Sequence, residues 1–98
     1  MGKDEKISMI PVACIYRDNK RSAIEVELPG VEKKDVELEM TPSGFCVSGH
    51  RDVLDYSGCW ILEREIVPKK AQATFKQGLL TATAPMAESM KRHKITIN

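Results

Sequence analysis

Three cysteines and two histidines are the side chains of this 98-residue chain that could hold a metal ion or attack a substrate. Cys46 and His50 are expected on one face of a strand. At about 3.3 Å per residue, four positions separate them by roughly 13 Å. Two ligands of one zinc ion each lie only about 2.0–2.3 Å from it. His93 stands alone in a basic segment. The sequence therefore predicts no metal site.

Cys59 is the best candidate for covalent chemistry. It lies between Gly58 and Trp60, in an expected loop or at the start of a strand. A cysteine nucleophile requires a neighbouring base and a lowered pKa. A small apolar side chain is the simpler interpretation, and we predict that the protein is not an enzyme. An enzyme that uses Cys59 is the alternative, and thiol-reactivity profiling distinguishes the two.

Acidic and phosphate-binding chemistry also finds no support in the sequence. Six glutamates occupy polar positions of expected strands, and none interrupts an apolar face as a buried acid–base pair would: Glu25, Glu27, Glu37, Glu39, Glu63 and Glu65. No glycine-rich stretch opens a helix. Fifteen basic and fourteen acidic residues give a net charge of +1, which is not the basic field that nucleic acids attract. We expect no cofactor and no nucleic-acid partner.

The cysteine pattern and the start of the chain bear on its compartment. The cysteines are odd in number and widely spaced, unlike a disulfide framework, which favours a reducing cytosol. Residues 1–6 lack the apolar stretch of a secretion signal. No apolar run approaches the roughly 20 residues of a membrane span. The sequence predicts a cytoplasmic protein with no membrane partner.

These side chains must be positioned by strands, because apolar residues recur at every second position in most of the chain. Strands are expected over 12–16, 22–28, 36–40, 45–48, 60–67, 72–75 and 79–84. A helix over 31–40 is rejected because the apolar residues alternate from Val36 onward. Residues 1–9 are expected to be disordered or loosely attached, and 86–94 to form a mobile tail. Phe45, Trp60 and Phe75 are expected in the core. The pattern predicts one all-β domain, an immunoglobulin-like antiparallel sandwich of about seven to nine strands.

Four segments in series resemble one known family. Residues 73–85 carry Ala-x-x-x-x-Gly-x-Leu-x-x-x-x-Pro, formed by Ala73, Gly78, Leu80 and Pro85, and this pattern resembles the signature of small heat shock proteins. Residues 25–38, which contain Leu28, Pro29 and Gly30, are similar to the Leu-Pro-Gly stretch of the α-crystallin domain. Residues 45–51, and then 58–60 with 66–68, look like its later segments. The resemblance covers residues 12–85 and implies a sandwich that holds partly unfolded proteins without ATP.

The resemblance also divides the chain and implies a docking site. It gives a short arm (1–10), an α-crystallin domain (11–85) and a C-terminal extension (86–98). Ile95 and Ile97 are similar to the Ile-x-Ile tail with which family members dock on a neighbouring subunit. In an extended tail, residues two apart point the same way. The implied groove lies between two strands and is formed by Val36, Leu38, Met40, Ala73 and Phe75.

The function implied is that of a holdase, an ATP-independent chaperone that binds aggregation-prone proteins and self-associates into dimers or larger oligomers. The chain departs from the family in two places. Its arm has about ten residues where most members have tens, and the loop from His50 to Cys59 is short where many members exchange a strand. These features favour an alternative, a CS-domain-like co-chaperone that docks on a larger chaperone. The signature around Gly78 and the isoleucine tail favour the small heat shock protein.

Overall fold

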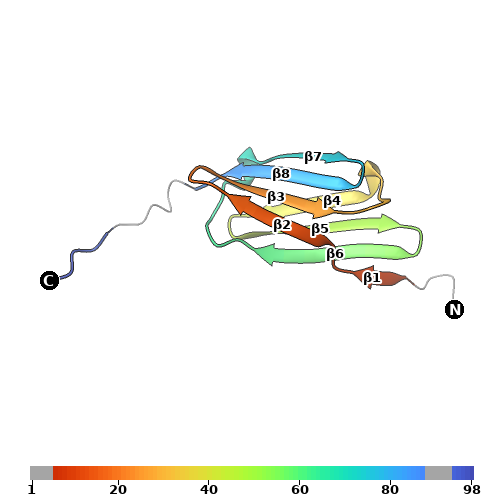
Figure 1. Cartoon of the computed structure of the whole chain (residues 1–98), viewed down its shortest axis with the longest axis horizontal. Coiled ribbons are helices and arrows are strands. Elements are labelled where there is room, and N and C mark those ends of the chain that lie inside the picture. Colours follow the sequence, from red (N-terminus) through yellow and green to blue (C-terminus); the bar gives the residue numbers. More distant parts are fainter. Residues whose placement is uncertain (1–5, 88–93) are drawn as a thin grey trace.

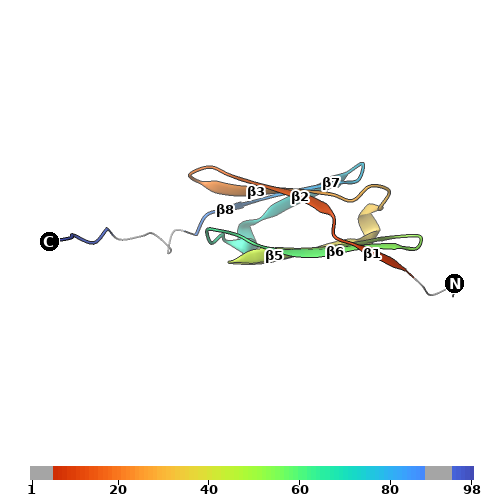
Figure 2. The same ribbon diagram turned by 60° about the horizontal axis from the view of Figure 1, so that its bottom comes forward.

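Two four-stranded sheets face each other in this computed structural model, which describes residues 6–87 and 94–98 (Figure 1). The eight strands are β1 (Ile7–Met9), β2 (Val12–Arg17), β3 (Arg21–Glu27), β4 (Val36–Thr41), β5 (Gly44–Arg51), β6 (Leu54–Ile61), β7 (Gln72–Lys76) and β8 (Leu79–Pro85). One sheet has the order β1-β6-β5-β4 and the other β2-β3-β8-β7. Figure 2 shows the sheets as two layers. The predicted all-β sandwich is confirmed. Every strand pairing is antiparallel except that of β1 with β6.

The core lies between the layers and is built from the alternating residues of both sheets. Ile24, Val26 and Leu28 are almost fully buried, and so is Phe45, which stacks on Trp60 with ring centroids 5.0 Å apart. The other buried hydrophobic residues are Val31, Val47, Tyr56, Leu62, Ile66, Leu80, Ala82 and Ala84. Alternation places the apolar residues of a strand on one face and the polar residues on the other. The pattern in the sequence therefore becomes a single core.

Gly78 lies in the turn between β7 and β8 and contacts the end of β3. The Leu28 amide donates a hydrogen bond to the Gly78 carbonyl over 2.6 Å. Gly78 has φ +80°, and a Cβ there would lie 3.2 Å from the carbonyl oxygen of Leu28. Glycine alone reaches this backbone conformation without strain. The turn thus holds the end of β3, before Pro29 and Gly30, against the start of β8.

The strand predicted over Trp60–Val67 is confirmed for Trp60 and Ile61 and is wrong from Leu62 onward. β6 begins at Leu54, directly after a turn at Asp52 and Val53, and ends at Ile61. The Leu62 amide then donates to the Ser43 carbonyl over 2.8 Å, and the Ile66 amide donates to the Pro42 carbonyl over 2.9 Å. Leu62 and Ile66 belong to a loop, and both side chains are buried at the end of the sandwich. Their apolar character therefore reflects burial and not a strand.

The expectation that residues 1–9 are disordered or loosely attached is wrong for residues 7–9. They form β1, which pairs in parallel with Leu54–Tyr56 of β6. The Ile7 amide donates to the Val53 carbonyl over 2.6 Å, and Lys6 lies 3.5 Å from the Asp55 carboxylate. A hydrogen bond from His50 and the charge of Lys6 hold the pKa of the Asp55 carboxyl below its usual range. Local alternation could not reveal this strand, because its partner lies far along the chain. The mobile tail predicted over 86–94 mostly lies outside the described residues.

Cys46 and Cys59 form a disulfide, which corrects the expectation that the cysteines are unlinked. The two residues face each other directly in the β5–β6 pairing. Both are exposed on the outer face of their sheet. Cys59 therefore lies within a strand rather than in a loop, and it has no free thiol to act as a nucleophile. Cys14, exposed on β2, is the remaining free cysteine.

Candidate docking groove

An apolar groove of about 360 Å³ runs between the edge strands of the two sheets. β4 supplies Val36 and Leu38, and β7 supplies Ala73 and Phe75. Leu80 of β8, which is 3 % exposed, lies behind them. Because β4 and β7 each end a sheet, their inward side chains have a strand neighbour on one side only. The groove is the resulting gap at this edge of the sandwich.

Register explains why these side chains share one groove. Val36 and Leu38 stand opposite Gly49 and Val47 of β5, on the inner face of their sheet. Ala73 and Phe75 stand opposite Ala82 and Leu80, on the inner face of the other sheet. Residues two apart on a strand share a face, so each edge strand contributes two side chains. An extended segment with apolar residues two apart has the matching spacing.

The structure brings four of the five predicted groove residues together. Met40 is the exception: it stands opposite Phe45 and packs against the core without lining the groove. Prediction from the sequence missed Lys33, Thr74 and Lys76, which also line the groove. Their polar side chains carry no apolar periodicity, so only the position of Lys33 before β4 and of Lys76 at the end of β7 could have indicated them.

Ile95 and Ile97 do not sit in the groove of their own chain. Their side chains are 80 % and 92 % exposed, and neither residue is in a strand. Figure 1 shows residues 94–98 well away from the sandwich. Ile95 and Ile97 thus expose two large apolar side chains, at a spacing that suits the groove, to another surface. The docking of this tail stays a prediction.

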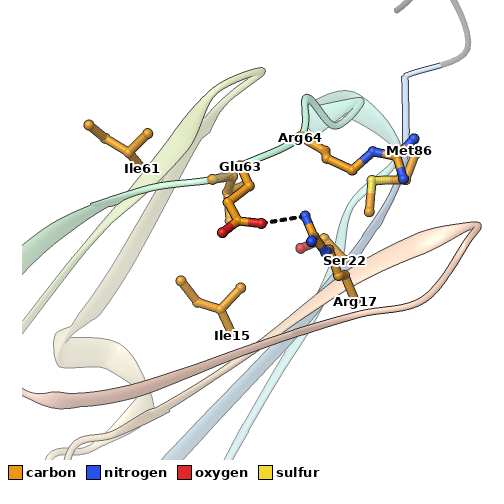
Figure 3. Close-up of a pocket in the computed structure, with 8 residues that line it drawn as sticks. Ile15, Arg17, Ser22, Ile61, Glu63, Arg64 and Met86 are labelled. Atoms are coloured by element: carbon orange, nitrogen blue, oxygen red, sulfur yellow. Dashed lines mark ion pairs between the residues drawn. The ribbon is translucent and has the colours of Figure 1, made fainter. Parts of the chain in front are cut away.

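A second pocket, of about 270 Å³, opens between β2 and the loop after β6 (Figure 3). Ile15, Leu62 and Met86 line it, and Arg17 bridges to Glu63 over 2.7 Å. This ion pair is exposed to solvent, where such pairs contribute roughly 0–1 kcal/mol.

Among residues 6–87 and 94–98, no cluster of His, Cys, Asp and Glu side chains could hold a metal ion. In the same residues, no helix has the length and apolar character to cross a membrane.

Solved structures with the same fold include small heat shock proteins. Heat shock protein 16.0 from Schizosaccharomyces pombe superposes with a TM-score of 0.73 at 25% identity, covering 95% of this chain and 77% of that chain. A small heat-shock protein from Xylella fastidiosa gives a TM-score of 0.69 at 15% identity, covering 92% of this chain and 97% of that chain. No family model matches the sequence.

Curated sequences agree with the structures. A probable 15 kDa heat shock protein of Leptospira interrogans is 24% identical over 92% of this chain and 81% of the relative. An 18 kDa antigen of Mycobacterium intracellulare is 22% identical over 99% of this chain and 74% of the relative. The two sheets, the edge groove and the signature glycine define an α-crystallin-type sandwich.

The predicted resemblance to small heat shock proteins is confirmed by these comparisons, in which the chain is similar to members of that family in both sequence and fold. This similarity favours the small heat shock protein over the CS-domain co-chaperone. The similarity supports a chaperone role in general terms.

Proposed function

We propose that the protein is a holdase that binds apolar segments of partly unfolded clients in the groove between β4 and β7. The groove carries the proposal because it is apolar, open to solvent and bordered by two strand edges. Apolar surface of this kind competes with aggregation by covering exposed segments of a client. No energy source is required, because binding only shifts the population of partly unfolded clients.

We further propose that the tail of a second copy covers the same groove until a client displaces it. Small heat shock proteins in general form oligomers and act on client proteins. In this chain Ile95 and Ile97 are exposed and two positions apart, as the groove requires. A fraction of uncovered grooves then exists at equilibrium, and dilution or heating enlarges it.

Replacing Ile95 and Ile97 by serine is expected to lower the oligomer mass. Each isoleucine loses its burial in a neighbour, worth about 1.5–3 kcal/mol. Light scattering of the full chain and of the double variant measures the mass over a dilution series. The matched control is Val53→Ser, which removes a side chain that is 53 % exposed in the β5–β6 turn. Equal masses for the wild type and the Ile95→Ser/Ile97→Ser variant would rule out tail docking as the basis of assembly.

Phe75→Asp is expected to weaken client binding about tenfold or more. A charge replaces the largest apolar side chain of the groove, and losing its burial costs roughly 1.5–3 kcal/mol. Light scattering of a heated model client, with increasing amounts of chaperone, measures the effect. Val53→Asp is the control, because it introduces the same charge outside the groove. Equal suppression by both variants would show that clients bind elsewhere.

A cytoplasmic location also stays a proposal. The sequence supported it through an apparent lack of disulfides, and the Cys46–Cys59 bond removes that support, since disulfides persist mainly in oxidising compartments. Fractionation of the source cells, with the thiols trapped at lysis, checks both the location and the bond.

A further inference from the structure

The rim of the groove is basic. Lys33, just before β4, and Lys76, the last residue of β7, are the ionisable side chains that line the groove. Both residues are exposed to solvent. The ion pairs found among residues 6–87 and 94–98 involve neither of them. Their two positive charges are therefore presented to whatever occupies the groove.

Acidic residues close to the groove do not neutralise this rim. Glu37 and Glu39 belong to β4 but stand opposite Ser48 and Cys46, on the outer face of the sheet. Glu32 lies 3.6 Å from Lys34 rather than from Lys33. Asp35 is half-buried and does not line the groove. The two charged residues that line the groove are therefore both lysines.

The tail of this protein carries the same sign of charge. Lys91, Arg92 and Lys94 precede Ile95 in the sequence. A docked tail brings its basic flank toward a basic rim, and like charges repel over a Debye length of roughly 8 Å at physiological salt. The isoleucine side chains have the spacing that the groove requires, but the charges beside them would oppose docking.

We propose that the groove prefers extended client segments whose apolar residues, two apart, are flanked by Asp or Glu. This inference rests on the proposed holdase function and names the kind of segment that displaces the tail. An acidic flank pairs with Lys33 and Lys76, whereas the basic tail occupies the groove as a weak, displaceable cover. The charges thus select clients, and the apolar floor supplies most of the affinity.

The proposal predicts opposite salt dependences for the two occupants. Two exposed charge pairs of roughly 0.2–1 kcal/mol each correspond to about a fivefold preference at low salt. Salt screens attraction and repulsion alike. Binding of an acidic-flanked segment therefore weakens as salt rises, whereas binding of the basic tail segment strengthens. Near 1 M salt, where the Debye length is about 3 Å, the two affinities converge.

Two fluorescent peptides test this inference. Both contain Ile-Thr-Ile, one with the Lys-Arg-His-Lys flank of this chain and one with a Glu-Asp-Glu flank. Fluorescence anisotropy measures their affinities for the Ile95→Ser/Ile97→Ser variant, whose own tail cannot compete, from low to high salt. Lys33→Glu/Lys76→Glu is expected to reverse the preference. Lys20→Glu, in the turn after β2, is the matched control and is expected to leave it unchanged.

The possible outcomes distinguish a failure of the charge preference from a failure of the proposed holdase function. Equal binding of the two peptides at low salt, lost in Phe75→Asp, would overturn the charge preference while the groove remains the binding site. Binding of both peptides that Phe75→Asp leaves intact would overturn the groove itself. If the double glutamate variant unfolds, Lys33→Gln/Lys76→Gln replaces it, and it is expected to abolish the preference rather than reverse it.

Discussion

Replacing both Cys46 and Cys59 by alanine is expected to lower the free energy of unfolding by about 3 kcal/mol. The disulfide joins residues 13 apart in the sequence. Closing a loop of this size removes roughly that much conformational entropy, as free energy, from the unfolded chain. Both residues are exposed, so the substitution itself loses little packing. For a domain of about 100 residues, the midpoint of thermal unfolding falls by roughly 12–24 °C.

Reduction of the wild-type protein provides an independent measurement of the same bond. With dithiothreitol its midpoint is expected to fall to that of the Cys46→Ala/Cys59→Ala variant, while the variant itself does not respond. Cys14→Ala is the control, because Cys14 is a free cysteine on the other sheet. A wild-type midpoint that is the same with and without reductant would contradict the stabilising role of the disulfide.

Leu28→Ala is expected to cost about 3–5 kcal/mol of unfolding free energy. Leu28 has no exposed surface, and it lies where the end of β3 meets the turn at Gly78. Removing a buried leucine side chain loses its transfer free energy and leaves a cavity. Urea denaturation measures the loss as a lower midpoint at an unchanged slope.

The control for this variant lies on the neighbouring strand. Leu79 is also a leucine, but its side chain is 37 % exposed, and Leu79→Ala is expected to cost less than about 1 kcal/mol. Both variants are compared without reductant, so that the disulfide is present in each. Equal losses of unfolding free energy in the two variants would contradict the prediction that burial of Leu28 sets the cost.

The groove could largely be predicted because its signals are local. Val36 and Leu38 alternate within one strand, Phe75 within another, and the family resemblance placed these strands together. Met40 was also predicted but does not line the groove, because alternation gives the face of a strand but not how far along the strand a groove extends. The basic rim escaped prediction for a related reason: Lys33 and Lys76 are marked by their position beside an apolar floor, which only the folded chain shows.

The disulfide and β1 could not be predicted because both depend on register between segments. Cys46 faces Cys59 only because the turn at Asp52 and Val53 starts β6 at Leu54. The sequence placed Cys59 in a loop or at the start of a strand, so no cysteine was expected opposite it. β1 has three residues and a parallel partner, and no periodic pattern can be recognised over so short a span.

The pairing of β3 with β8 has a consequence for how the chain folds. β4, β5 and β6 follow one another along the chain and pair through short turns, so their sheet can form early. β3 can pair early with β2, but its other edge has to wait for β8, because Arg21 pairs with Pro85 at the far end of the domain. Closing so long a loop is slow. On the ribosome, the second sheet therefore stays incomplete until almost the whole domain has emerged. Until then, this chaperone exposes its own apolar strands and resembles the proteins that it is proposed to protect.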